Sequence, residues 1–133
     1  MANAFYANGK EHLLTCLVDW DTDAMDFELV DATDYTLDLA NDDFFDDVTV
    51  GGREANFGPL LSKTSALGVA DAADFSFLTV TGDECEYLIL YEDTAVASTS
   101  GLVCNIDAAT GLPITPNGAN IDVVLNASGI FEI

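Results

Sequence analysis

Apolar and polar residues alternate with a period of two in several short stretches of this 133-residue chain. The stretches 25–30, 74–80, 85–92 and 121–125 each place apolar side chains at alternate positions. Successive side chains of a β-strand point to opposite faces of its sheet, so this period is typical of strands rather than helices. The alternation therefore predicts a mainly β fold.

Turn-forming residues separate these stretches at short intervals. Gly, Pro, Asn and Asp favour reverse turns, and they gather at 51–52, 82–83, 107–111 and 116–118. Further strands are expected at 102–106 and 130–133, and the latter would tie Ile133 into a sheet. About seven short strands at such spacings predict one antiparallel β-sandwich or jelly-roll-like domain over residues 1–133.

Two segments before residue 50 have a helical pattern instead. Residues 4–18 are compatible with a short helix, which Gly9 weakens. Residues 42–48 suit one helical turn that would point Phe44, Phe45 and Val48 inward. We therefore expect one or two short helices near the N-terminus of the β domain.

The strands differ in their expected burial. The stretch 85–92 also contains Leu88 and Leu90, so its middle is apolar on both faces and predicts a central strand. The stretch 25–30 places Asp26 and Glu28 opposite its apolar positions. It is therefore expected to have one face in water.

The charge is strongly one-sided. There are 24 acidic residues against Lys10, Arg53 and Lys63, which gives a net charge of −21. Such a chain repels nucleic acid and anionic membranes, and it also repels itself at low salt. Molar salt screens that repulsion, so we expect a halophilic host, with a marine or ordinary host and an acidic surface kept for solubility as the alternatives.

No segment has the length and apolar character of a membrane span, and the N-terminus lacks the pattern of a signal peptide. Three cysteines, Cys16, Cys85 and Cys104, match no zinc-binding spacing. Cys85 and Cys104 occupy apolar strand positions and are expected to be small buried hydrophobes in a reducing compartment. We therefore expect no cofactor and no metal.

Two acidic clusters are candidate cation sites. Asp19, Asp21 and Asp23 match the first half of a calcium loop, but Ala24 and Val30 replace its Gly and Glu. A solvated acidic turn is the better interpretation. The second cluster comprises Asp42, Asp43, Asp46 and Asp47. Its repulsion is expected to be relieved by salt or by a basic partner rather than by a bound metal.

The sequence predicts no enzyme. His12 is the only histidine, and none of the common nucleophile, metalloprotease or phosphate-binding motifs occurs. A paired-carboxylate hydrolase stays as a minor alternative. Residues 126–128 match the N-glycosylation pattern, a short match that arises often by chance.

Several blocks resemble a family of small virion proteins encoded beside the head and tail genes of tailed phages. The most distinctive is 107–118, which reads Asp-Ala-Ala-Thr-Gly-Leu-Pro-Ile-Thr-Pro-Asn-Gly. The weaker blocks are 2–6, 31–36, 44–48, 61–64, 71–75 and 91–94. The resemblance covers nearly the whole chain, which departs from the family pattern by its scarcity of Lys and Arg.

The resemblance implies a non-enzymatic structural protein of the virion, assembled in the host cytoplasm, and transfers no catalytic residue. Our leading hypothesis is a capsid decoration (cement) protein that binds the major capsid protein or other virion proteins, as a homo-oligomer on the particle. The alternatives are a tail, neck or fibre-base component and a host-surface or glycan-binding module. Phe5, Tyr6 and Trp20 are the candidate partner contacts, and Trp20, Tyr35 and Tyr87 are the candidates for a glycan.

Overall fold

The computed structural model describes residues 3–133, and the chain forms a mainly β, sandwich-like domain of antiparallel sheets with one α-helix near its N-terminus. This confirms the predicted fold class. The central sheet has five strands in the order β1-β8-β7-β2-β3. These strands are β1 (Ala4–Phe5), β8 (Leu102–Ile106), β7 (Tyr87–Glu92), β2 (Met25–Val30) and β3 (Arg53–Phe57).

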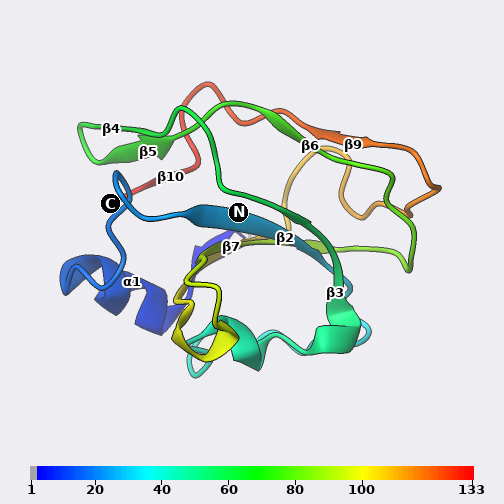
Figure 1. Ribbon diagram of the computed structural model, residues 1–133, viewed down its shortest axis with the longest axis horizontal. Helices are drawn as coiled ribbons and strands as arrows, with labels where there is room; N and C mark the ends of the chain where they lie inside the picture. The colour runs from blue at the N-terminus through cyan, green and yellow to red at the C-terminus, as the bar shows by residue number, and fades with distance from the viewer. Residues whose placement is uncertain (1–2) are drawn as a thin grey trace.

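Two smaller sheets form an upper layer over this central sheet (Figure 1). One has the order β10-β5-β4, and the other pairs β6 with β9. Their strands are β4 (Thr64–Ala66), β5 (Val69–Asp71), β6 (Phe75–Phe77), β9 (Ile121–Val123) and β10 (Phe131–Glu132). An apolar cluster that includes Phe27, Phe75 and Leu90 fills the space between the layers.

A lower layer with little regular structure covers the other face of the central sheet (Figure 1). It contains α1 (Ala7–Leu14) and the 3₁₀ turns η1 (Phe45–Asp47), η2 (Val50–Gly52) and η3 (Ala97–Thr99). A second apolar cluster, with Tyr35, Phe45 and Ile89 among its members, lies beneath the sheet here. No helix in the described part of the chain is long and apolar enough to cross a bilayer.

The expected helices are shorter than predicted. The helix expected within 4–18 is limited to α1, and its Gly9 has a packing role: a Cβ there would lie 2.3 Å from the carbonyl oxygen of Val103 in β8. Only glycine lets the helix approach the strand this closely. The turn expected at 42–48 is the 3₁₀ helix η1, where Phe45 and Val48 are buried as predicted.

The central position of the 85–92 strand is confirmed, because β7 lies between β2 and β8. The prediction for β2 was wrong in one respect. Asp26 and Glu28 do not face water. Each side chain is only 5% exposed, because it lies between the central sheet and the lower layer. A covering made of turns has no sequence period of its own, so the alternation in β2 could not reveal that both of its faces are covered.

Ile89 lies in the middle of β7 with no exposed surface. We expect Ile89→Ala to reduce the free energy of unfolding by about 2–5 kcal/mol, because it removes buried methyl groups and leaves a cavity. Denaturant titration measures the change. Leu78→Ala, at a side chain that is 72% exposed, is the control and should have little effect. A loss below about 0.5 kcal/mol for Ile89→Ala would contradict its placement in the core.

Candidate functional site

The structure separates the three predicted partner contacts. Tyr6 is fully buried in the lower apolar cluster, and Trp20 is only 8% exposed in the upper one. Neither side chain offers a free surface to a partner. Phe5 is half-buried in the edge strand β1 and lines a pocket. Of the glycan candidates, Tyr35 is buried like Trp20, and Tyr87 is half-buried.

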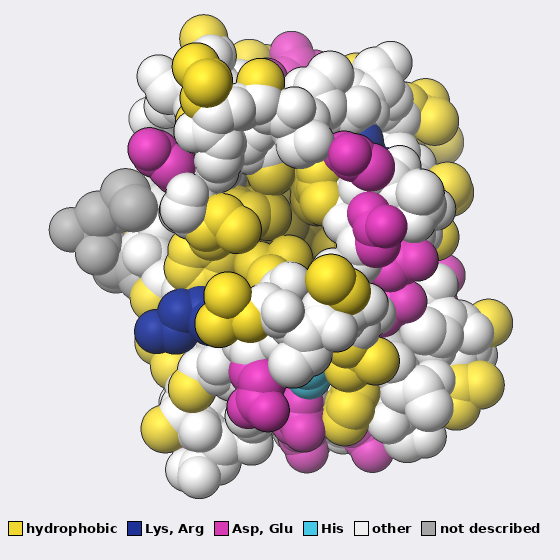
Figure 2. All heavy atoms as spheres, turned by 90° about the vertical axis from the view of Figure 1, so that its left-hand side faces the viewer, with side chains coloured by type: hydrophobic (Ala, Val, Ile, Leu, Met, Phe, Trp, Pro, Cys, Tyr) yellow, Lys and Arg dark blue, Asp and Glu magenta, His cyan; other side chains and the backbone are white. Residues whose placement is uncertain are grey.

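The pocket lies between the edge of the central sheet and β10 of the upper layer. Its volume is about 220 Å³, and its lining comprises Asn3, Ala4, Phe5, Cys104, Asn105, Ile106, Ile130, Phe131 and Glu132. The rings of Phe5 and Phe131 meet edge to face at 5.3 Å, and Trp20 packs behind Phe131 at 5.4 Å. Figure 2 shows this face of the molecule with an apolar hollow between the two layers. Trp20 therefore supports a wall of the pocket and has little exposed surface of its own.

Exposed apolar side chains occur on the elements that border this face in Figure 1. Leu14 at the end of α1 is 82% exposed, and Ile133 beyond β10 is 70% exposed. Leu67, at the tip of the β4–β5 hairpin, is fully exposed and has a φ of +55°, a left-handed conformation that Asn or Gly adopts more easily. Together with the pocket, they make this face the best candidate for an interface.

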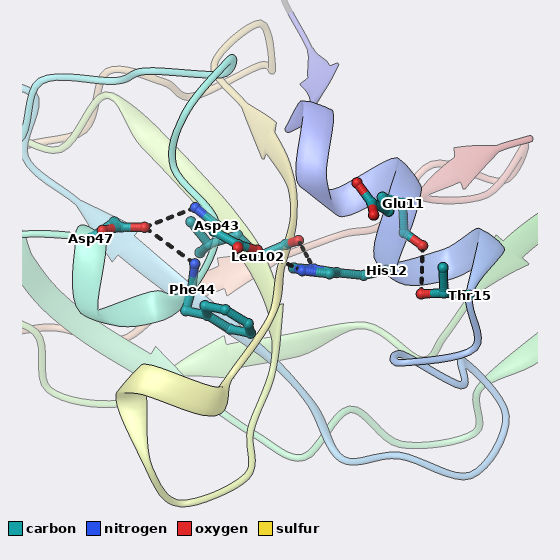
Figure 3. A network of polar contacts seen from close by, with 7 residues as sticks. All are labelled: Glu11, His12, Thr15, Asp43, Phe44, Asp47 and Leu102. Carbon is teal, nitrogen blue, oxygen red and sulfur yellow. Dashed lines mark hydrogen bonds and ion pairs between the residues drawn. The ribbon is translucent and has the colours of Figure 1, made fainter.

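Hydrogen-bond donors of the protein itself bind carboxylates of the acidic cluster at 42–47, an arrangement that the sequence did not predict. Asp42 accepts a hydrogen bond from the hydroxyl of Tyr35 at 2.6 Å and another from the backbone of Asp38. Asp47 accepts from the backbone N–H groups of Asp43 and Phe44 (Figure 3). Charge-assisted bonds of this kind stabilise a carboxylate without a metal or a basic partner.

His12 has a structural position. It is 5% exposed, and Nε2 lies 2.6 Å from Oδ1 of Asp43 while Nδ1 lies 3.3 Å from the carbonyl oxygen of Leu102 (Figure 3). Its ring stacks on Phe44 with centroids 5.3 Å apart. The nearby Thr15 hydroxyl does not bond His12, because it donates to the Glu11 carbonyl within α1. His12 therefore ties α1 to β8 and to the loop before η1, and both ring nitrogens are engaged by these partners.

The acidic turn at Asp19, Asp21 and Asp23 is closed by its own side chains. Asp23 accepts from the Asp19 backbone at 2.7 Å, and Asp19 accepts from the Asp21 backbone at 3.0 Å. These contacts agree with an acidic turn, whose Asp19 and Asp21 are exposed. Likewise, Asn126 is exposed in a turn, where its side chain accepts a hydrogen bond from the Ser128 backbone.

A third group of carboxylates has the geometry to share a cation in the described part of the chain. Oxygens of Asp31, Asp34 and Asp83 lie within 4.8 Å of one another. Burial, and then the charges of Asp83 and Asp31, raise the pKa of the neighbouring Glu54. Carboxylates suit a hard cation such as Ca²⁺, but exposed acidic groups also gather without one. We therefore assign no metal to this group.

Two of the three Lys and Arg side chains bind backbone carbonyls. Arg53 donates to the carbonyl oxygens of Val48 at 2.9 Å and Phe45 at 2.7 Å, and it lies over the Phe45 ring. Lys63 donates to the carbonyl of Trp20 at 2.7 Å and also to that of Asp23. Arg53 therefore fastens the η1 region to β3, and Lys63 joins the loop before β4 to the loop before β2. These contacts leave little positive charge on the surface for a phosphate or a polyanion.

The carboxyl groups whose pKa values are raised most are the two buried ones of β2, Asp26 and Glu28. Burial, and next the charge of the nearby Asp93, raise the pKa of Asp26 to about 6. Burial also raises the pKa of Glu28 to about 7, although a hydrogen bond from Asn56 at 2.9 Å partly opposes this shift. The pair lies inside the sheet rather than in an open cleft, so it is not placed to act on a substrate.

Two cysteine predictions are confirmed: Cys85 and Cys104 are buried, free thiols. Burial raises the pKa of each to about 12, which keeps them protonated and unreactive.

Comparison of the chain with protein-family models and with curated proteins finds no match.

We expect the melting temperature to fall by several degrees as pH rises from about 5 to about 8 in molar KCl. The folded state retains protons on Asp26 and Glu28 that the unfolded chain, with its ordinary pKa values of 3.8 and 4.5, has already released. Stability is therefore present at low pH and is lost as pH rises through about 6 and 7. Thermal unfolding monitored by circular dichroism at a series of pH values measures this loss.

Glu28→Gln should flatten much of this slope, because its amide does not titrate and still offers an oxygen to Asn56. Glu84→Gln, at an exposed carboxylate, is the matched control and should leave the slope nearly unchanged. An identical slope in both variants would show that the buried pair is not its source.

Proposed function

We propose that this chain is a non-enzymatic structural protein of a virus particle, and specifically a capsid decoration protein. The observation that best supports a docking role is the apolar pocket beside Phe5 and Phe131, on a face bordered by exposed leucines. The engagement of His12 by Asp43 and Leu102 supports a structural rather than a catalytic use of the only histidine. The sequence blocks described above give the proposal its viral context.

In this proposal the protein resides on the virion, and its partner is the major capsid protein or another virion protein. Many copies would bind the shell, where small interfaces add up through multivalency. A homo-oligomer on the particle would strengthen attachment further. A tail, neck or fibre-base component would use the same face, and the location of the protein on the particle distinguishes these possibilities.

The direct test is to locate the protein in purified particles. We expect mass spectrometry to find many copies per particle, and electron microscopy of labelled particles to place them over the shell. A few copies at one vertex or along the tail would support the alternative virion part. Absence from particles that otherwise contain a complete set of structural proteins would overturn the viral proposal.

We expect the melting temperature to rise clearly between low and molar KCl if the host is halophilic. At −21 net charge the folded chain repels itself, and a Debye length of about 3 Å at molar salt removes most of this cost. A parallel series in potassium sulfate separates screening from the strengthening of apolar burial. A melting temperature that is flat across the KCl series would contradict the halophilic assignment.

A further inference from the structure

The pocket has the dimensions and chemistry of a receptor for one large apolar side chain. At about 220 Å³ it is smaller than the roughly 300–1,000 Å³ of drug-sized ligand sites. Phe5, Ile106, Ile130 and Phe131 supply aromatic and aliphatic walls. A buried apolar anchor in such a pocket is the usual centre of a protein–protein contact.

The surroundings of the pocket are acidic. Glu132 is exposed and belongs to the lining, whose described residues include no Lys or Arg. Asp21 lies beside the same upper sheet, since it accepts a hydrogen bond from the Ser65 hydroxyl in β4 at 2.9 Å. Figure 2 shows acidic side chains above, to the right of and below the hollow, and one basic side chain at its lower left edge, so the acidic groups outnumber the basic ones around it. The local field therefore has the sign of the whole chain.

This charge decides between the available occupants. At low salt, a second copy of the chain would bring another −21 charges to an already acidic face, and a polyanion would be repelled in the same way. In molar salt, only the repulsion between carboxylates that touch across the contact, within a Debye length of about 3 Å, remains. An apolar side chain flanked by cations would satisfy both the walls and the rim. Charge complementarity of this kind also speeds association and excludes wrong partners.

We propose that the pocket binds a large apolar side chain on a Lys- or Arg-containing segment of a partner protein. This inference rests on the proposed docking function, because it assigns the partner chemistry of the same face. On a particle, the segment would belong to the shell protein.

The test titrates the intact protein with nine-residue peptides that carry a central Phe between two pairs of Lys. Trp20 is the only tryptophan and packs on the pocket wall at Phe131, so its fluorescence reports occupancy. Calorimetry provides an independent affinity. We expect the Phe peptide to bind at least about tenfold more tightly than the same peptide with a central Ala, because only Phe fills the pocket. A peptide with Glu in place of Lys should bind more weakly still.

Two variants locate the site. Ile130→Trp fills the pocket and should abolish the preference for Phe over Ala. Glu132→Lys reverses the rim charge and should weaken the Lys peptide several-fold without changing the fold. Asp46→Lys makes the same charge change at an exposed residue of η1 and should have a much smaller effect. Circular dichroism of each variant establishes that it is folded.

Equal affinity for the Phe and Ala peptides would overturn the assignment of the pocket, and a preference for Glu would overturn the assigned charge. Self-association that Ile130→Trp abolishes would instead identify a second copy as the occupant and would also overturn the proposal. Virion location is measured separately. A protein that is present on particles but binds none of the peptides retains the proposed function and loses this inference.

Discussion

The fold depends on covering the lower face of the central sheet with a layer that has almost no regular hydrogen-bonded structure. Buried backbone groups in such a layer need partners that a helix or sheet would otherwise supply. Aspartate side chains meet much of this need, because each carboxylate accepts from N–H groups of its own loop. Backbone N–H groups of the lower layer are bonded in this way by Asp31, Asp38, Asp42, Asp47 and Asp93. Carbonyl oxygens of Phe45 and Val48 are bonded by Arg53. The acidic composition is therefore partly a requirement of the fold and not only a property of the surface.

The strands with strong alternation could be predicted from the sequence, and β2, β7, β8 and β9 lie inside the expected stretches. The three-residue strands β4 and β5 could not, because β4 is exposed throughout and β5 fully buries only Ala70, so neither has enough apolar positions to produce a period. The pairing of His12 with Asp43 was also unpredictable. It joins residues far apart in the sequence, and nothing in either local pattern identifies the other.

The candidate site was predictable in part. Aromatic residues near the N-terminus were expected to contact a partner, and Phe5 does line the pocket. However, the sequence shows which aromatic residues could contact a partner, but it does not show which of them are buried in the core. Tyr6 follows Phe5 by one residue and therefore points to the opposite face of the sheet, where the lower layer buries it. Trp20 is used in the same way behind Phe131.

Two walls of the pocket come from β1 and β10, while β8 supplies a third, and β1 and β10 are each paired over only two residues. They also lie near opposite ends of the described chain, so bringing them together closes the longest loop in the molecule. Segments with so few ladder bonds open at a lower free energy than the core strands β2 and β7, and their amide hydrogens exchange earlier. The pocket can therefore widen by local opening of its walls while the central sheet stays intact. A receptor built in this way can admit anchors of different shape without disturbing the rest of the domain.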